Sequence, residues 1–221
     1  KLWMFRTLTR PEDSFDSAPF ADGKTVRDLC RGSYTTLPDG VSENHGFVHP
    51  SYMGSGLVLP GKTLNVLGLY GQPIPPHLFW RVRDAYEVLK RWCDGGGAPH
   101  CPQGMDWPYY TYPDHAFLHA VANLHLKDAD AALLERRALQ TVERSSGAHG
   151  GRMIPEEVVQ RCSFGSRPTL MGERMSLYLA NAYLAHRRLG VGETPPDEED
   201  FERRVRGVHV YPHGGALIHR H

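Results

Sequence analysis

Four side chains that can bind or transfer protons lie close together in the segment DGVSENHGFVHPSY, which covers residues 39–52: Asn44, His45, His49 and Tyr52. An imidazole is a competent base near neutral pH, and a phenol can act as an acid, or as a base when its pKa is lowered. Amide and imidazole donors can also neutralise a carboxylate without a metal ion. These groups could therefore remove a proton from a carbon beside a carboxylate and protonate a leaving sugar oxygen.

Two other interpretations of this segment stay open. The chain has 13 histidines, so a polar loop that is merely rich in histidine is one of them. The other is zinc binding, because His45 and His49 are four residues apart and would share one face of a helix. Gly46 and Pro50 disfavour a helix there, and no glutamate stands between the histidines as in HExxH. We expect no metal.

A second group of side chains could contact a sugar. The proline-containing loop at 105–115 has four aromatic residues, Trp107, Tyr109, Tyr110 and Tyr112. Aromatic rings match the apolar faces of pyranoses, so a stacking wall is one prediction, and packing against the following helix is the alternative. Arg174 is a candidate for a carboxylate contact, because arginine suits bidentate binding of that group.

The composition limits the class of protein. The formal net charge is +0, hydrophobic residues make up 40% and charged residues 23%, which is typical of a soluble globular protein. The charge gives no support to binding of nucleic acid or of a membrane surface. No apolar run is long enough to span a membrane. No CxxC pair, Walker loop, GxSxG or GxGxxG motif is present, so we expect neither a zinc knuckle nor a nucleotide cofactor.

The hydrophobic periodicity predicts a mainly helical chain. We expect helices over 25–33, 51–70, 77–92, 114–126, 128–144 and 170–189. Asp128 should cap the fifth of these helices, and Gly190 should end the last one in the left-handed conformation. Polar loops separate the helices, which favours antiparallel helical hairpins, as in bundles, solenoids or α/α toroids.

The pattern changes after residue 192. An acidic, proline-containing stretch, ETPPDEED, reads as a linker, and two β-rich runs at 208–211 and 216–219 surround a Gly-Gly turn. This pattern predicts a β-hairpin. We therefore expect an α-helical domain at 1–192, a linker at 193–204 and the start of a β-domain at 205–221.

The segment DGVSENHGFVHPSYMGSG resembles the DGS-F-x-x-H-G…Y…G segment of polysaccharide lyases that join an α/α toroid to an antiparallel β-sandwich. Heparinase II/III-like, hyaluronate/chondroitin and ulvan-type lyases are of this kind. The closing VHVYPHGGALIHRH is similar to the opening strands of their sandwich. The motifs cover residues 35–60 and 200–221. The chain departs from the pattern in having Val41-Ser42 where the family often has Ser-Phe, and in having a second histidine, His49.

The resemblance implies helical hairpins of an incomplete α/α toroid, followed by the first hairpin of a β-sandwich. It implies β-elimination of a uronic-acid polysaccharide, with release of a 4,5-unsaturated end. Asn44 would neutralise the uronate carboxylate, His45 would assist it or act as base, and Tyr52 would be the acid or also the base. No cofactor is implied, and the location would be extracellular or periplasmic.

Two other functions stay open. An α/α-toroid glycoside hydrolase would need paired carboxylates. Asp106, Asp114 and Glu173 are candidates for that pair, but nothing in the sequence pairs them. The second alternative is a non-catalytic glycan-binding or scaffold toroid.

Overall fold

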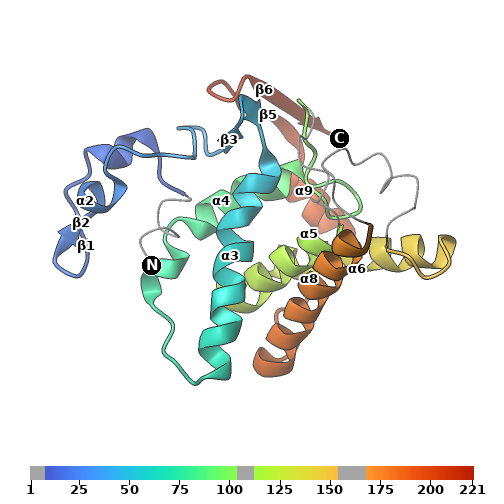
Figure 1. Ribbon diagram of the computed structural model, residues 1–221. Helices are drawn as coiled ribbons and strands as arrows, with labels where there is room; N and C mark the ends of the chain where they lie inside the picture. The colour runs from blue at the N-terminus through green and yellow to red at the C-terminus, as the bar shows by residue number, and fades with distance from the viewer. Residues whose placement is uncertain (1–7, 104–111, 154–167) are drawn as a thin grey trace. The chain divides into compact units, whose positions relative to one another are not determined.

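A computed structural model describes residues 8–103, 112–153 and 168–221 (Figure 1). The described chain is mainly helical, with three two-stranded antiparallel sheets, which confirms the predicted helical class. The toroid and the sandwich stay predictions. The chain forms two compact units. Unit 1 comprises Lys1–Trp92, Pro99–Met105 and Glu202–His221, and unit 2 comprises Cys93–Ala98 and Asp106–Phe201.

Unit 1 is built around a pair of packed helices, α3 and α4. Its elements are η1 (Pro11–Ser14), β1 (Pro19–Ala21), β2 (Lys24–Thr25), α2 (Val26–Cys30), β3 (Glu43–Asn44), β4 (Phe47–Val48), α3 (Pro50–Leu69), η2 (Pro76–Phe79), α4 (Val82–Trp92), β5 (Gly207–Tyr211) and β6 (Ala216–Arg220). Met53, Leu57 and Leu64 recur at helical spacing on α3 and are buried, and Tyr86 and Leu89 are buried on α4. The apolar stripes predicted the positions of both helices, although β1–β4 were not expected.

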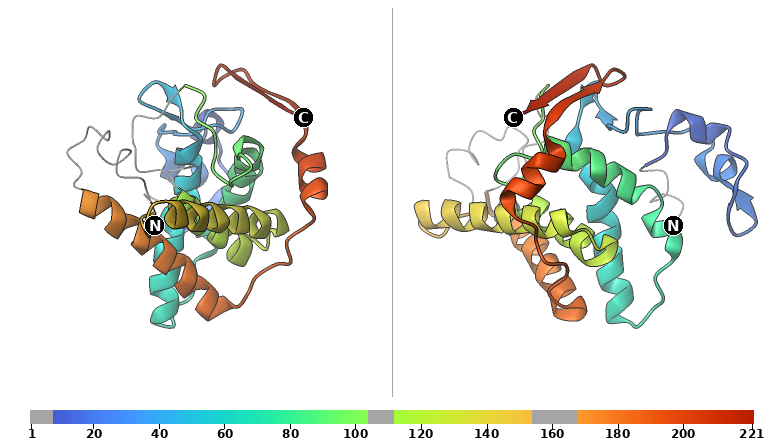
Figure 2. Two further views of the ribbon diagram at one scale, coloured as in Figure 1. Left: turned by 90° about the vertical axis from the view of Figure 1, so that its right-hand side faces the viewer. Right: turned by 180° about the vertical axis from the view of Figure 1, so that it is seen from behind.

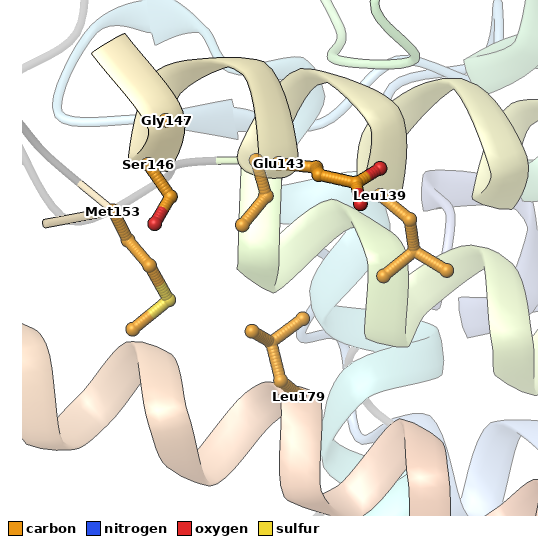
Figure 3. A pocket seen from close by; sticks show the side chains of 7 residues that line it. Leu139, Glu143, Ser146, Gly147, Met153 and Leu179 are labelled. Atoms are coloured by element: carbon orange, nitrogen blue, oxygen red, sulfur yellow. The ribbon is translucent and has the colours of Figure 1, made fainter. Parts of the chain in front are cut away.

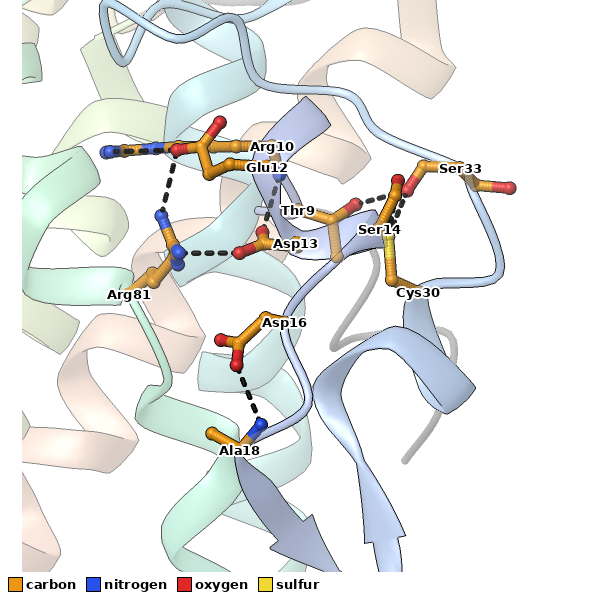
Figure 4. A network of polar contacts seen from close by, with 10 residues as sticks. All are labelled: Thr9, Arg10, Glu12, Asp13, Ser14, Asp16, Ala18, Cys30, Ser33 and Arg81. Atoms are coloured by element: carbon orange, nitrogen blue, oxygen red, sulfur yellow. Dashed lines mark hydrogen bonds and ion pairs between the residues drawn. The ribbon is translucent and has the colours of Figure 1, made fainter.

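The expectation of one continuous helix over 77–92 is wrong. The segment forms the 3₁₀ turn η2 and then, after a break, helix α4. Arg81 stands at the break with a φ of 54°, which is outside the right-handed helical region. Its guanidinium Nη2 lies 2.5 Å from Oδ1 of Asp13, a carboxylate that is fully buried (Figure 4). This ion pair between distant residues accompanies the non-helical conformation of Arg81, which the spacing of apolar residues does not predict.

In unit 2, α5 packs against both α6 and α8 (Figure 1). The elements are α5 (Tyr112–Val121), the π-helical turn η3 (Ala122–Leu126), α6 (Ala129–Ala148) and α8 (Pro168–Leu189), and helix α9 (Glu198–Val205) begins in unit 2 and ends in unit 1. The Asp128 side chain caps α6 by accepting a hydrogen bond from the Ala131 N–H, as predicted. Gly190 follows α8 with a φ of 92°, as predicted. On α6, Leu139 is 42% exposed.

Helix α9 begins within the acidic stretch at 193–200 that reads as a linker, and it ends at Val205. Its first turn carries Glu198, Glu199 and Asp200, and its last turn carries Arg203 and Arg204. This charge order suits the helix dipole, which favours anions at the N-terminus and cations at the C-terminus. Phe201 and Val205, one turn apart, are buried. Whether the expected limits at 192 and 204 separate domains stays a prediction.

The predicted C-terminal hairpin is confirmed. Strands β5 and β6 pair from Gly207 opposite Arg220 to Tyr211 opposite Ala216, and Figure 2 shows them following α9. The hairpin turn contacts other parts of unit 1, because Oδ2 of Asp39 accepts hydrogen bonds from the N–H groups of His213 (2.8 Å) and Gly214 (3.0 Å). A two-stranded hairpin is marginal alone in water, so such contacts are needed to hold it.

Candidate functional site

The segment with the four predicted site residues folds into a small hairpin that leads into helix α3. Asn44 pairs with Phe47 across strands β3 and β4, and His45 and Gly46 form the turn between them. Both turn residues have positive φ values, 55° and 84°. A two-residue turn of this kind matches the twist of the strands, and Gly46 adopts it without steric cost. The side chain of His45 is therefore exposed at the tip of the hairpin.

His49 and Tyr52 lie together where the hairpin meets α3. His49 is the N-cap residue of that helix and is 0% exposed. The His49 N–H donates to the Ser42 carbonyl at 2.8 Å, and the Tyr52 N–H donates to the His49 carbonyl at 2.8 Å. The two rings meet edge to face, with centroids 4.6 Å apart and an interplanar angle of 80°. The partly exposed phenol thus rests against a buried imidazole.

Asn44 carries a buried donor on this hairpin. Its Nδ2 has no hydrogen-bond partner among the described residues, and neither has Oγ of Ser42 or Oγ1 of Thr36. Thr36 and Ser42 face each other in an isolated β-bridge. Side chains alternate along a strand, so Asn44 and Ser42 belong to the same face of the hairpin. Buried polar groups normally have hydrogen-bond partners, so each of these three atoms has unused capacity for a polar ligand or water.

The predicted sugar-stacking wall is not tested. Trp107, Tyr109 and Tyr110 lie outside the described residues, and Tyr112 begins α5 with a side chain that is not described. Arg174 lies on α8, where its Nη2 donates to the Tyr178 hydroxyl at 3.1 Å. A cleft shared by these residues and the hairpin stays a prediction.

The described residues provide no matched pair of carboxylates for the glycoside hydrolase alternative. Asp106 lies outside the described residues, Asp114 is buried at 3% exposure, and Glu173 is exposed on α8. A glycoside hydrolase needs two carboxylates on either side of the scissile bond. Among the described residues, Asp114 and Glu173 therefore differ too much in exposure to be read as such a pair.

Sequence reasoning missed a polar network in unit 2. His186 on α8 approaches Glu135 on α6, with Nε2 2.7 Å from Oε1, and its Nδ1 lies 2.9 Å from the Gly190 carbonyl oxygen. Both partners accept hydrogen bonds, so both imidazole nitrogens must donate, and His186 is an imidazolium. The hydrogen bond to Glu135 accordingly raises the pKa of His186 above its usual value, although burial opposes this.

The network continues to the buried amide of Asn123 in η3. Its Nδ2 donates to Oε2 of Glu135 at 3.1 Å, and its Oδ1 accepts from the Glu193 N–H at 2.8 Å. Gly192 passes so close that a Cβ there would lie 2.3 Å from Asn123 Oδ1, and its φ of 81° also requires glycine. π-helical turns such as η3 occur frequently at functional sites. No short motif could have revealed this set, because Glu135 and His186 are far apart in sequence.

The network borders a cleft of about 680 Å³ between α6 and α8. Its walls are mostly apolar, with Ala132 and Leu139 on α6 and Leu179 and Ala182 on α8. A neighbouring hollow of about 650 Å³, which extends to Met153, shares Leu139, Glu143 and Leu179 with it (Figure 3). A concave, mainly apolar site with a few polar groups is the usual form of a small-ligand site.

Comparisons with known proteins assign no family. The chain matches no protein-family model, and no curated protein and no solved structure is significantly similar to it. None of the described helices combines the length and the apolar character that crossing a bilayer requires.

Proposed function

We propose that this protein cleaves a uronic-acid-containing polysaccharide by β-elimination. The observation that supports the proposal is the contact between the Tyr52 and His49 rings, 4.6 Å apart, directly after the hairpin that carries Asn44 and His45. All four residues of the candidate set thus belong to one short structural unit. The motif resemblance supports the same chemistry.

In the proposed reaction, a base removes the proton from C5 of the uronate. The electron pair forms the C4–C5 double bond, the bond from C4 to the glycosidic oxygen breaks, and an acid protonates the leaving oxygen. The C5 proton is acidic enough only if the neighbouring carboxylate is neutralised. The side chain of Asn44 is partly exposed, and its amide would supply a hydrogen bond to that carboxylate.

Exposure assigns different roles to the two histidines. His49 is fully buried, so it would position the Tyr52 ring rather than touch the polymer. His45 is exposed at the hairpin turn and can approach a uronate, as a second donor to the carboxylate or as the base. Tyr52, partly exposed, would protonate the leaving oxygen, and it could also serve as the base.

The test is the ultraviolet absorbance of the unsaturated product on a panel of uronans. Tyr52→Phe keeps the ring against His49 and removes only the phenolic oxygen, so turnover should fall about 10²–10⁴-fold while substrate binding changes little. Tyr70→Phe is the matched control, because Tyr70 is 76% exposed at the end of α3, and it should leave turnover unchanged. Asn44→Ala should also lower turnover, through loss of carboxylate neutralisation.

Other outcomes would point to the alternatives. New reducing ends without absorbance would indicate hydrolysis, and binding of a uronan without any cleavage would indicate a glycan-binding protein. Near wild-type turnover in Tyr52→Phe would remove Tyr52 from the mechanism and leave the histidines as candidates.

A further inference from the structure

The cleft between α6 and α8 has a rigid polar end. Oε1 and Oε2 of Glu135 bind His186 and Asn123, and Asn123 in turn holds the Glu193 N–H. The hydrogen bonds therefore connect α6, α8, η3 and the loop after Gly190 at one end of a cavity. Such a site is fixed before any ligand arrives, which lowers the entropic cost of binding.

The charges that line the cleft leave a negative excess. Glu135 is neutralised by the His186 imidazolium, and Arg136, which also lines the cleft, shares its partner Glu198 with Arg137. Glu143 and Glu193 also line the cleft, and neither carboxylate has an ion-pair partner in the described ranges. Two carboxylates beside a largely apolar wall favour a ligand that carries a positive charge on an apolar body.

An exposed aromatic ring completes the cleft. Tyr183 on α8 lines it and is 67% exposed, so its ring is accessible to a ligand. The face of a tyrosine ring attracts an ammonium group, and it also matches the apolar face of a six-membered ring. Leu179 and Ala182 extend this apolar wall along the same helix face.

We propose that the cleft between α6 and α8 binds an organic ammonium ion on a six-membered ring, with Glu143 and Glu193 contacting the charge and Tyr183 contacting the ring. Either an amino sugar or a cyclic alkylamine has this chemistry. A uronate fits this end of the cleft less well, because its carboxylate would face the like charges of Glu143 and Glu193. The site is independent of the proposed lyase reaction, since it uses none of the residues assigned to that reaction.

The test is calorimetric or NMR titration of the protein with four probes. Glucosamine and cyclohexylamine carry the ammonium group, and glucose and cyclohexanol are their uncharged counterparts. We expect both amines to bind in the millimolar range or tighter and the uncharged probes to bind at least tenfold more weakly. A stronger response to glucosamine identifies the amino sugar as the natural class, and a stronger response to cyclohexylamine identifies the alkylamine.

Variants locate the site. Glu143→Gln and Tyr183→Ala should each weaken amine binding about twofold to fivefold, as expected for an exposed charge pair and a cation–π contact. Glu173→Gln is the matched control on α8, because Glu173 is exposed and does not line the cleft, and Tyr70→Ala is the control for the tyrosine. Binding that is absent, equal for the uncharged probes, or unchanged in both cleft variants would overturn the proposal.

Discussion

The Asp13 network of unit 1 and the Glu135 network of unit 2 both bury a carboxylate beside a cation. In unit 1 the cation is Arg81, which is charged at every pH that proteins encounter (Figure 4). In unit 2 it is His186, an imidazolium that loses its charge as the pH rises. The charge of Arg81 therefore stays constant with pH, whereas the charge of His186 makes one edge of a cleft dependent on pH.

The two networks also differ in how far they are open to solvent. Asp13 is fully buried, and burial raises its pKa more than the Arg10 N–H and the Arg81 charge lower it. Burying the charged Asp13 carboxylate therefore costs desolvation energy, which its hydrogen bonds and ion pair must offset. The His186 side chain is 28% exposed and borders a cavity, so its network can respond to a ligand or to protons.

The largest expected effect is on the unit 1 network. Arg81→Ala leaves the buried Asp13 carboxylate with only a backbone partner, and the free energy of unfolding should fall by about 3–5 kcal/mol. Asp13→Asn removes the buried charge instead and should cost less. Chemical denaturation of both variants measures the difference, with Arg83→Ala, an exposed arginine in the first turn of α4, as the control. Equal stability of Arg81→Ala and Arg83→Ala would contradict the structural role given to Arg81.

The next effect concerns two buried imidazoles in unit 2. Burial lowers the pKa of His115 to about 3 and that of His119 to about 4. Both pKa values are lower in the folded state than in the unfolded state. The stability that these histidines allow is therefore fully present above the unfolded-state pKa near 6.5, and it is lost as pH falls from there toward the folded-state pKa. His119 should therefore cost about 2 kcal/mol of stability at pH 5 relative to neutral pH.

His119→Gln should remove the loss of stability at pH 5 that His119 causes, about 2 kcal/mol, and leave the loss that other groups cause. Amide hydrogen exchange of α5 and α6 at pH 5 and 7.5 would measure it, because exchange resolves the unit in question. The same change of stability with pH in the variant and in the wild type would show that His119 does not stay neutral in the folded protein.

The smallest effect has the opposite sign. The pKa of His186 is raised in the folded state, so its contribution is present below about 6.5 and is lost as pH rises through the folded-state pKa. We expect the wild type to lose up to about 1 kcal/mol relative to His186→Gln between pH 6 and pH 9. Denaturation at the two pH values checks this. A constant difference between the two proteins would mean that His186 is not an imidazolium in the native state.

The sequence alone determined the features that depend on neighbouring residues. Asp128 caps α6, as its position before the apolar pattern predicted. The apolar spacing located α3, α6 and α8, and the Gly-Gly turn located the β5–β6 hairpin. Caps, periodicity and turns were predictable because their energies come from residues at most a few positions apart. The grouping of His49 with Tyr52 was predictable for the same reason.

The tertiary structure alone decided the features that join distant segments. Arg81 leaves the helical conformation where it binds Asp13, and sequence periodicity contains no trace of that partner. The pairing of Glu135 with His186, and the passage of Gly192 beside Asn123, bring together segments that no local pattern connects. Burial also separated the candidate histidines, since His49 is enclosed and His45 is exposed. Desolvation and long-range hydrogen bonds set these outcomes, and both depend on which segments pack together.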